Sequence, residues 1–508
     1  MSATPVSPDE PFEFPARGRS RLWLRFLLAG VLIVVLTAGV TATGGLLQVQ
    51  GFVDDIKQGG TISGLTNVIS RADVGDPQTI LLIGSDHRFG DDRTNARSDT
   101  MILVRLDPDA SATTVLSIPR DLKVSFTQPD GGERSAAKIN ETYTIGGEAF
   151  TAKVIKRLLG GIEINHVINV NFKGFRKAVD AIGCVYADVD HRYYHSNIGS
   201  VEQYAEIDIS AGYQKLCGQK ALDYVRFRHA DSDFVRAARQ QDFLRQVKSQ
   251  YGVDRFLSDP HQITKQIGKY LRTDKQLQSK EEFLTLATLM AYSAQHPIRQ
   301  IPFPAGLATI DGVSYVVSSD EQIAQVRRAF LSPPPKEPKA KGSGGKRGNG
   351  RKAKGPDTAG LADMAQTGQD YAIQLGPMKF PIYYPKLLLA GDQYMGLEPG
   401  EYPRAYRIKG PDGKMYGAYR FVVPTGHDGN YYGIQGTSWT DPPILRSPSA
   451  DTPTVNGKKL LLFYDGKLLR TVGWKTSQGS YWVQNTLQEE LSNAQMLSIA
   501  GSLTRLGR

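Results

Sequence analysis

The sequence predicts an α/β domain, in which helices flank a central sheet, between an N-terminal transmembrane helix and a small, mainly β domain. Three observations support this prediction. Strand-like and helix-like patterns alternate from residue 77 to about 331, a long uncharged segment precedes them, and aromatic residues gather after residue 371. At 508 residues, the chain is long enough for two folded units.

The N-terminal segment indicates the compartment. No residue from 26 to 53 is charged, and this length exceeds the roughly 20 residues that span a bilayer. Arginines precede the segment and two aspartates follow it, so the positive-inside rule keeps the N-terminus in the cytoplasm. We therefore expect a single-pass protein of the cell membrane with a cytoplasmic tail (1–25), a transmembrane helix (26–50) and an extracellular stalk (51–76). A cleaved signal peptide is the alternative, but its apolar stretch is usually only about 7 to 15 residues long.

Short apolar runs mark the strands of the α/β domain, residues 77–331. Thr79–Gly84 is a continuous apolar run that ends in glycine, as expected of a strand buried on both faces. The runs Met101–Leu106 and Thr113–Ile118 repeat this pattern, which does not determine how the strands pair. The elements expected after them are a helix at 149–159, a strand at 166–170, a helix at 172–182, a strand at 185–189, and helices at 219–224, 236–251, 260–271 and 281–293.

The chain has two cysteines, Cys184 and Cys217. An exported domain meets oxidising conditions, in which an even number of cysteines indicates disulfide bonds. We predict a disulfide between the two. Two separate buried thiols are the alternative.

Residues 332–370 are predicted to be a disordered linker. The part from Ser332 to Gly360 is rich in proline, glycine and lysine and has almost no apolar residues, so it cannot build a core. Eight basic residues and one acid lie between Lys336 and Lys354, which places +7 of the formal charge of +10 there. Because this tract is expected outside the cytoplasm, its charge favours anionic wall polymer or lipid as a partner, and no nucleic acid.

The C-terminal segment, residues 371–508, differs from the rest in composition, with 12 of the 23 tyrosines and three of the four tryptophans. Short apolar runs at 460–464, 468–474 and 481–483 are separated by turn residues and predict hairpins. We expect a small, mainly β domain with a closing helix near 488–503. Its aromatic residues either stack on sugars or build the β core.

Two aspartates border the apolar strands and are candidates for a metal site. Asp86 follows the run that ends at Gly84, and Asp99 precedes the run that begins at Met101. Magnesium prefers hard oxygen ligands and commonly binds through one or two carboxylates plus the phosphates of a substrate. We therefore expect Asp86 and Asp99 to bind Mg²⁺, with Mn²⁺ as the alternative.

Four arginines and a glutamine are candidates for a pyrophosphate site, because a planar guanidinium makes bidentate contacts with phosphate. Arg120 stands at the end of a predicted strand. Arg226 and Arg228 are two apart, so an extended chain would point them the same way. Arg236 and Gln240 are four apart and share one helix face. The alternative for each residue is an ordinary surface ion pair, since charged side chains are mostly exposed.

Several sequence blocks resemble the LytR-CpsA-Psr family. Their order and spacing match that family over about residues 77 to 250. The blocks are Gly84-Ser85-Asp86, Arg97-Ser98-Asp99-Thr100-Met101, Ser117-Ile118-Pro119-Arg120-Asp121, Lys138-Ile139-Asn140, and Tyr224-Val225-Arg226-Phe227-Arg228-His229 with Asp231, Asp233, Phe234, Arg236, Arg239, Gln240 and Gln241.

The resemblance implies an α/β/α domain with a central mixed sheet, and a membrane-anchored extracellular phosphotransferase. Such an enzyme takes a glycopolymer from a polyprenyl-pyrophosphate carrier and attaches it to peptidoglycan in cell-wall assembly, with a pyrophosphatase side activity as a further expectation. In the family, the counterparts of Asp86 and Asp99 bind magnesium. The resemblance also makes Asp99 and Arg120 the expected catalytic residues. The residues whose counterparts engage the pyrophosphate are Arg120, Arg226, Arg228, Arg236 and Gln240.

Several points stay open in the sequence. Asp99, Asp121 and His229 are weak candidates for a general base. Either Arg236 or its neighbour Arg239 faces the site. A non-catalytic protein that binds or senses the lipid carrier would keep the same residues, and a structural wall-anchoring protein is a third alternative. The identity of the transferred polymer does not follow from the sequence.

Overall fold

The computed structural model describes residues 49–86, 98–110, 113–198, 205–227, 233–251, 265–294, 298–332, 360–396, 403–426, 429–446, 448 and 452–507. Contacts divide the chain into two compact units, Met1–Gly51 and Phe52–Arg508. Only the last two residues of the expected transmembrane helix, 26–50, fall within the described part. Among the helices that the structure describes, none has both the length and the apolar character needed to cross a bilayer.

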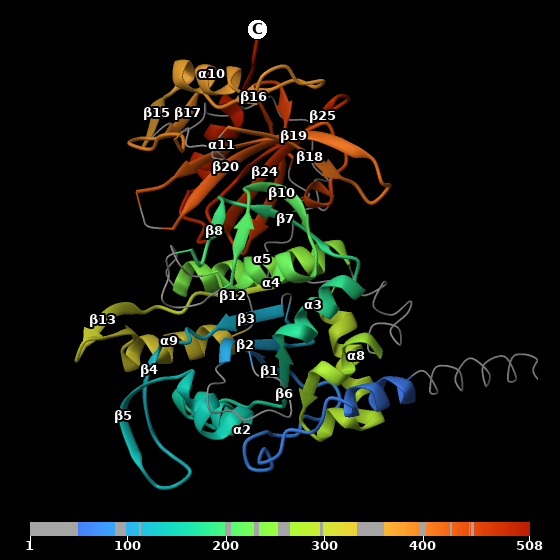
Figure 1. Cartoon of the computed structure of the whole chain (residues 1–508), viewed down its shortest axis with the longest axis vertical. Helices are drawn as coiled ribbons and strands as arrows, with labels where there is room; N and C mark the ends of the chain where they lie inside the picture. Colours follow the sequence, from blue (N-terminus) through green and yellow to red (C-terminus); the bar gives the residue numbers. More distant parts are fainter. Residues whose placement is uncertain are drawn as a thin grey trace, which may run out of the picture. The chain divides into compact units, whose positions relative to one another are not determined.

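A six-stranded sheet forms the centre of the α/β domain (Figure 1). In order across the sheet, its strands are β11 (Leu271–Thr273), β6 (His166–Asn171), β1 (Gln78–Ser85), β2 (Ser98–Leu106), β3 (Thr113–Ser117) and β12 (Ile298–Ile301). β1 is antiparallel to β2 and parallel to β6. β3 is antiparallel to β2 and parallel to β12, and β11 is antiparallel to β6. The predicted α/β fold with a central mixed sheet is therefore confirmed.

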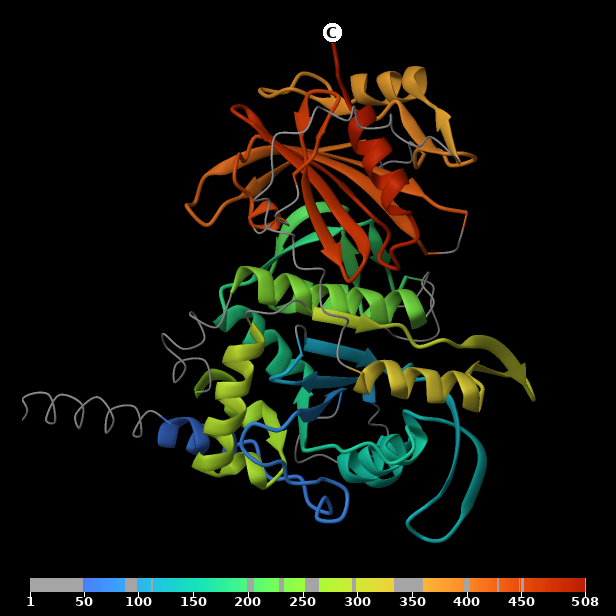
Figure 2. The same cartoon turned by 180° about the vertical axis from the view of Figure 1, so that it is seen from behind.

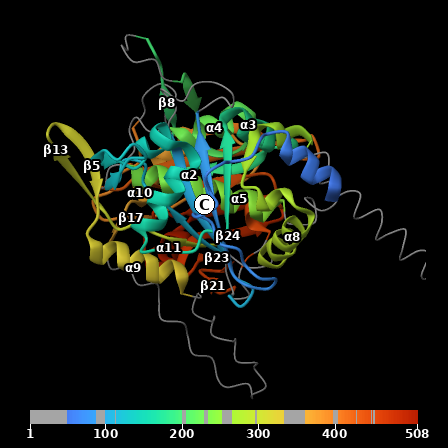
Figure 3. The same cartoon turned by 90° about the horizontal axis from the view of Figure 1, so that it is seen from below.

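Among the residues that the structure describes, the helices around the sheet include α2 (Glu141–Leu158), α3 (Phe172–Ala181), α4 (Gly218–Arg226), α5 (Asp233–Gln250), α8 (Lys280–Ala294) and α9 (Asp320–Leu331). Successive residues of β1 point to opposite faces of the sheet and so enter two cores. Leu81 lies in a core with Phe330 of α9, whereas Ile80 packs with Leu286 and Leu289 of α8. The view from below shows α8 and α9 on either side of the strands (Figure 3). Helices thus cover both faces of the sheet.

Among the short strands of this domain, sequence patterns predicted β7 (Val185–Val189) and missed the others. The short strands pair as β4 (Lys123–Thr127) with β5 (Glu133–Lys138), β7 with β10 (Gly212–Leu216), β8 (Tyr193–His195) with β9 (Ile207–Ile209), and β13 (Gly306–Ile310) with β14 (Val313–Val317). The helix expected at 260–271 is also wrong at its end. Gly268–Tyr270 form a 3-10 turn, and Leu271 begins β11 because it pairs with Val170 of β6. Pairing with the neighbouring strand β6 outweighs the helical spacing of this segment.

The C-terminal domain is built on a six-stranded antiparallel sheet. Its strands, in spatial order, are β18 (Arg404–Lys409), β19 (Met415–Pro424), β20 (Tyr431–Thr437), β25 (Gly479–Gln484), β24 (Leu468–Thr476) and β23 (Leu461–Asp465). Helix α11 (Asn493–Ser502) packs against this sheet, as Figure 2 shows. The predicted β domain with a closing helix is confirmed, and the helix is shorter than expected.

The expected linker, 332–370, extends too far toward the C-terminus. Residues 333–359 lie outside the described part of the chain, but the next residues belong to the β domain. Strand β15 (Leu361–Asp363) pairs with β17 (Leu387–Leu389), and helix α10 (Ala365–Ile373) buries Tyr371 in the core. This segment is ordered because its apolar residues find partners far along the chain, which composition does not reveal.

Aromatic residues build the core of the C-terminal domain. Tyr419, Tyr432, Tyr481 and Trp482 are fully buried. Among the tyrosines and tryptophans described after residue 371, Tyr464 alone is strongly exposed, at 41%. Of the two alternatives for these residues, the structure favours the β core over a platform for stacking on sugars.

Candidate functional site

Asp99 is the extra residue of a β-bulge at the start of β2. The end of the central sheet where β1 finishes and β2 begins is called the sheet edge from here on. Gly84 pairs with Thr100 and Ser85 pairs with Ser98, so nothing on β1 lies opposite Asp99. A bulge changes the direction of a side chain and is common beside active sites. Asp86, which follows β1 directly, is exposed at the same edge. The two predicted metal ligands therefore come from the adjoining ends of β1 and β2.

Glycine at position 84 permits the close approach of these two strands. A Cβ atom added to Gly84 would lie only 3.0 Å from the Cβ of Thr100. Thr100 follows Asp99 directly, so a larger residue at position 84 would push on the backbone that carries Asp99. The glycine in the Gly84-Ser85-Asp86 block thus has a packing role at the site.

Arg120 reaches this edge from the segment after β3. The backbone N–H of Ile118 donates to the carbonyl of Met101 at 2.9 Å, which keeps the end of β3 beside the start of β2. The Arg120 guanidinium donates through Nη1 to Oδ1 of Asp99 at 2.7 Å. Its side chain is 11% exposed and that of Asp99 is 28% exposed, so the pair is partly open to solvent. The structure thus brings together the carboxylate and the arginine that the sequence places in successive blocks.

Asp121 lies in a cluster of positive charge. Its carboxylate is 3.5 Å from Nε of Arg120 and 3.1 Å from Nζ of Lys138. Burial acts to raise the pKa of Asp121, but nearby cations outweigh it and hold the pKa below its ordinary value; these include Arg236 on α5. A carboxylate held ionised by cations is a poor proton acceptor, so Asp121 does not match the general base that was a candidate.

Sequence reasoning did not place Lys138 in the site. The hairpin of β4 and β5 pairs Lys138 with Lys123, two residues after Asp121. The backbone N–H of Asn140 also donates to the carbonyl of Arg120 at 3.1 Å. The Lys138-Ile139-Asn140 block was visible in the sequence, but a lone lysine has no spacing that predicts its contact with Asp121.

Helix α5 supplies two of the predicted pyrophosphate residues. Arg236 is 5% exposed, and its charge helps to lower the pKa of Asp121. Nε2 of Gln240 donates to Oγ1 of Thr100 at 3.0 Å and to the carbonyl of Val225 at 3.1 Å. One face of α5 therefore meets the start of β2 and the end of α4.

Arg239 makes a different set of contacts. It is fully buried, and its guanidinium donates to the hydroxyl of Tyr193 at 3.1 Å and to the carbonyls of Tyr224 at 3.0 Å and Phe227 at 2.9 Å. These bonds engage Arg239 in the interior, where it holds the end of α4 against α5. The structure thus engages Arg239 in interior contacts of the fold, whereas the charge of Arg236 acts on Asp121.

Arg226 lies in a helix, which corrects the expectation of an extended chain. It is the last residue of α4, and Phe227 after it is buried. Arg226 bonds Asp223 at 2.7 Å, and its guanidinium lies 5.5 Å from the ring centre of Phe172. Phe172 directly follows the end of β6, which runs parallel to β1, so Arg226 belongs to the same edge of the sheet. Arg228 and His229 lie outside the described residues.

A buried polar network lies behind this edge, and sequence reasoning missed it. Oγ of Ser85 donates to Oδ1 of Asn169 at 3.0 Å, and Nδ2 of Asn169 donates to Tyr143 at 2.7 Å and to Glu148 at 2.8 Å. Arg272 pairs with Glu148 at 3.0 Å. Burial, followed by the charge of Glu148, raises the pKa of Tyr143 to about 12. The network holds Ser85, and hence the backbone that leads to Asp86.

The donors at the site fit a hard divalent cation. Asp86 and Asp99 offer carboxylate oxygens at one edge, and Mg²⁺ commonly takes one or two carboxylates and completes its shell with phosphate and water. Among the described residues, one group of three potential ligands converges closely, and it consists of Asp180, Cys184 and Cys217. Its two sulfurs are joined to each other, so that group is not a metal site.

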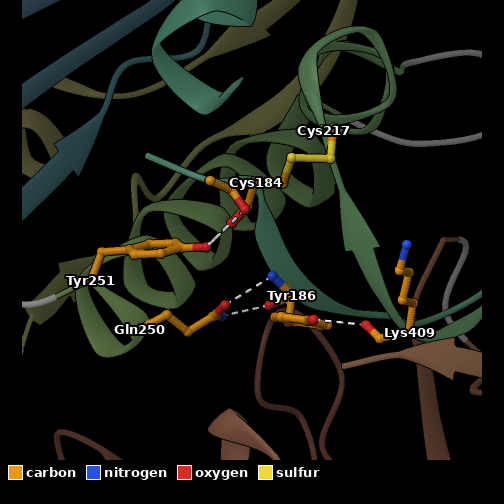
Figure 4. Close-up of a disulfide and its surroundings, with 7 residues drawn as sticks. Cys184, Tyr186, Cys217, Gln250, Tyr251 and Lys409 are labelled. Atoms are coloured by element: carbon orange, nitrogen blue, oxygen red, sulfur yellow. Dashed lines mark hydrogen bonds between the residues drawn. A yellow bond between two sulfur atoms is a disulfide. The ribbon is translucent and has the colours of Figure 1, made fainter. Parts of the chain in front are cut away.

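The predicted disulfide between Cys184 and Cys217 is present, with the Cα atoms 4.5 Å apart (Figure 4). It joins the turn after α3 to the start of α4. The hydroxyl of Tyr251, at the end of α5, donates to the carbonyl of Cys184, and Gln250 exchanges hydrogen bonds with the backbone of Tyr186. The bridge therefore braces the three helices α3, α4 and α5, two of which carry residues of the site.

The fold and the site define a class of protein, an α/β domain that gathers cationic side chains and two carboxylates at one edge of a mixed sheet. The chain belongs to the LytR_cpsA_psr family, whose sequence model matches residues 54–330.

Individual relatives are similar over half of the chain or more. The polyisoprenyl-teichoic acid–peptidoglycan teichoic acid transferase TagU of Halalkalibacterium halodurans is 27% identical over 308 residues, which is 60% of this chain and 95% of the relative. The protein of the same name from Oceanobacillus iheyensis is 28% identical over 329 residues, covering 61% and 93%. Among solved structures, B. subtilis TagV matches with 24% identity and a TM-score of 0.40, covering 50% of this chain and 96% of TagV.

Proposed function

We propose that this protein is a membrane-anchored, extracellular phosphotransferase that moves a glycopolymer from a polyprenyl-pyrophosphate carrier to peptidoglycan. The names of the TagU relatives, which describe transfer of teichoic acid to peptidoglycan, support this proposal. The uncharged segment 26–53 supports the membrane anchor. The observation that carries the proposal is the Arg120–Asp99 pair at 2.7 Å, with Arg236 and Gln240 of α5 directed to the same edge.

The arginines and Lys138 would bind the pyrophosphate. A pyrophosphate carries several negative charges, and guanidinium groups meet its oxygens with paired, charge-assisted hydrogen bonds. The bond to Asp99 already holds the guanidinium of Arg120 at this edge of the sheet. Phosphoryl transfer depends mostly on positioning and on stabilising the charge that spreads over the phosphate oxygens, so preorganised cations supply the main catalytic effect.

The transfer itself exchanges a phosphoanhydride bond of the donor for a phosphoester bond to the acceptor. A sugar hydroxyl of peptidoglycan attacks the phosphorus that bears the glycopolymer and forms a phosphodiester. The bond from that phosphorus to the bridging oxygen breaks, and polyprenyl phosphate leaves with the electron pair. The hydroxyl proton passes to solvent or to the leaving phosphate, because Asp121 is paired with cations and does not match a base.

Asp86 and Asp99 would hold Mg²⁺ or Mn²⁺. When bound, such an ion neutralises charge on the phosphate oxygens. Oδ1 of Asp99 accepts the bond from Arg120, and the carboxylate has further lone pairs that could bind a cation. In this arrangement Asp99 both orients Arg120 and supplies a metal ligand.

The proposal is tested by product formation. The full chain, in detergent or vesicles, is given a polyprenyl-pyrophosphate-linked saccharide, peptidoglycan and Mg²⁺, and saccharide covalently attached to peptidoglycan is measured. We expect attachment together with release of polyprenyl phosphate. Tight binding of the donor with no attachment would instead support a protein that holds or senses the carrier. Polyprenyl phosphate released without acceptor would measure the pyrophosphatase side activity.

A further inference from the structure

Helix α5 has a second face, which is turned away from the site. Arg236 and Gln240 meet the sheet edge, whereas Asp242 and Arg245 meet residues of the C-terminal β domain. The family match ends at residue 330, so it does not cover those partners. One helix therefore connects the site with the C-terminal β domain.

Five ionisable side chains form a buried cluster at this second face, namely Asp242 and Arg245 of α5 with Asp465, Arg470 and Glu489 of the β domain. Arg470 bonds Asp242, and Arg245 bonds Asp465. Further contacts link these side chains, since Arg245 is 3.5 Å from Asp242 and Arg470 is 3.7 Å from Glu489. Asp242 and Arg470 are both buried. A buried charge without a partner is strongly unfavourable, so these groups admit few relative positions.

A second buried contact joins the β domain to the strand that leads away from the disulfide. Arg420 of β19 bonds both carboxylate oxygens of Asp188 on β7, at 2.9 and 3.1 Å. The indole N–H of Trp482 donates to the same carboxylate at 2.8 Å. All three side chains are buried. The β domain is therefore attached at two places, one on α5 and one on β7, and Tyr186 of β7 exchanges hydrogen bonds with Gln250 at the end of α5.

We infer that Asp242 and Arg470 are positioning residues, through which the C-terminal β domain holds α5 so that Arg236 and Gln240 meet the pyrophosphate. This inference rests on the proposed function. Apolar contact is not directional and would tolerate a small rotation or slide of the helix. Charge-assisted hydrogen bonds are directional, so the cluster constrains the rotation of α5 as well as its distance. Small displacements at a reacting centre are costly, because a shift of about 1 Å can reduce a rate about 100-fold.

The test compares Arg470→Gln and Arg470→Lys in the full chain with a matched control, Arg446→Gln. Arg446 is an arginine of the same domain that pairs with Asp441 in an exposed position. Two quantities are measured, the kinetics of saccharide transfer to peptidoglycan and hydrogen–deuterium exchange in residues 236–246. For Arg470→Gln we expect kcat to fall about 10- to 100-fold, with a smaller change in KM, and exchange in α5 to increase at least about fivefold.

The conservative and control variants make the result specific. Arg470→Lys keeps the charge, so it should recover part of kcat and of the α5 protection, and Arg446→Gln should match the wild type. A folded Arg470→Gln chain with wild-type kcat and wild-type α5 exchange would overturn the inference, as would an equal loss in Arg446→Gln.

Two further outcomes are covered. If Arg470→Gln does not fold, the double variant Asp242→Leu/Arg470→Met removes both charges and should fold, because apolar pairs replace buried ion pairs with little loss of stability. It should still lose kcat, and wild-type kcat in this folded variant would overturn the inference. If the wild-type chain attaches no saccharide, the proposed function fails by itself, and α5 exchange in the variants then decides whether the β domain holds the helix.

Discussion

The guanidinium of Arg120 and the carboxylate of Asp99 lie 2.7 Å apart, although 21 positions separate the two residues in the chain. Two local features create this contact. The β-bulge turns Asp99 out of the strand pairing, and the bond between Ile118 and Met101 keeps the end of β3 beside the start of β2. The contact joins Asp99, an expected metal ligand, to Arg120, an expected pyrophosphate-binding residue.

Replacing Arg120 with alanine should abolish transfer while leaving the fold intact. The variant loses one preorganised donor to the phosphate, and such a loss typically lowers kcat by about 100- to 1,000-fold. Saccharide attachment to peptidoglycan measures the loss, and a thermal melt checks the fold. The control is Arg105→Ala, since Arg105 lies near the other end of β2 and pairs with Asp107 at 3.4 Å. Transfer near the wild-type rate in Arg120→Ala would contradict the assignment.

Arg236 and Arg239 should respond to substitution in opposite ways. Arg236→Gln should lower transfer strongly and stability little, because Arg236 belongs to the cationic cluster around Asp121. Arg239→Met should cost at least about 2 kcal/mol in the free energy of unfolding, since each buried acceptor left unpaired costs roughly 1 to 3 kcal/mol. Urea unfolding and transfer kinetics of both variants check this. A stable Arg239→Met chain that has lost transfer would reverse the two roles.

Removing the divalent cation should stop transfer. Chelation should abolish attachment and added Mg²⁺ should restore it. Two carboxylates supply only a few of the ligands that the ion needs, so the protein binds it reversibly. For Asp99→Asn, the Mg²⁺ concentration that gives half-maximal rate should rise at least about tenfold. Asp107→Asn, at the other end of β2, is the control. An unchanged Mg²⁺ dependence in Asp99→Asn would argue against Asp99 as a ligand.

Loss of the disulfide should destabilise the α/β domain. Cys184 and Cys217 are 33 positions apart, and closing a loop of this length stabilises a fold by about 3 to 4 kcal/mol in the chain-entropy model. Urea unfolding of the oxidised chain, the reduced chain and Cys184→Ala/Cys217→Ala measures the effect. The double variant should be insensitive to reductant. If reduction leaves the unfolding midpoint of the wild type unchanged, the bridge contributes nothing to stability.

Stability should depend on pH through Glu489. Burial, followed by the nearby charge of Asp465, raises the pKa of Glu489 to about 8. The folded chain therefore holds a proton that the unfolded chain releases near its ordinary carboxyl pKa of about 4.3. The stabilisation that goes with this proton is complete below that range and is lost as the pH rises through about 8.

Urea unfolding between about pH 5 and about pH 9 would show this loss. Glu489→Gln cannot ionise, so its free energy of unfolding should fall less steeply over that range than the wild-type value. Equal slopes in the two proteins would show that Glu489 does not carry the dependence.

Much of the fold and part of the site follow from the sequence because their signals are local. Continuous apolar runs predict β1 and β3, and turn residues predict the hairpins around β23, β24 and β25. The motif blocks also identified Asp86, Asp99 and Arg120. The short strand β5 was missed, because its mostly exposed residues show no alternation and are ordered by pairing with β4.

The amino-acid order by itself predicted the class of fold, the family, the disulfide and some of the residues near the Asp99–Arg120 pair, because these depend on patterns within short segments. Only the tertiary structure decided that Arg226 ends a helix, that Arg236 lies with Asp121 while Arg239 is buried elsewhere, and that Asp242 pairs with Arg470. These relationships join segments as far as 228 positions apart. Charged side chains accept many partners, so packing of the whole chain selects among them.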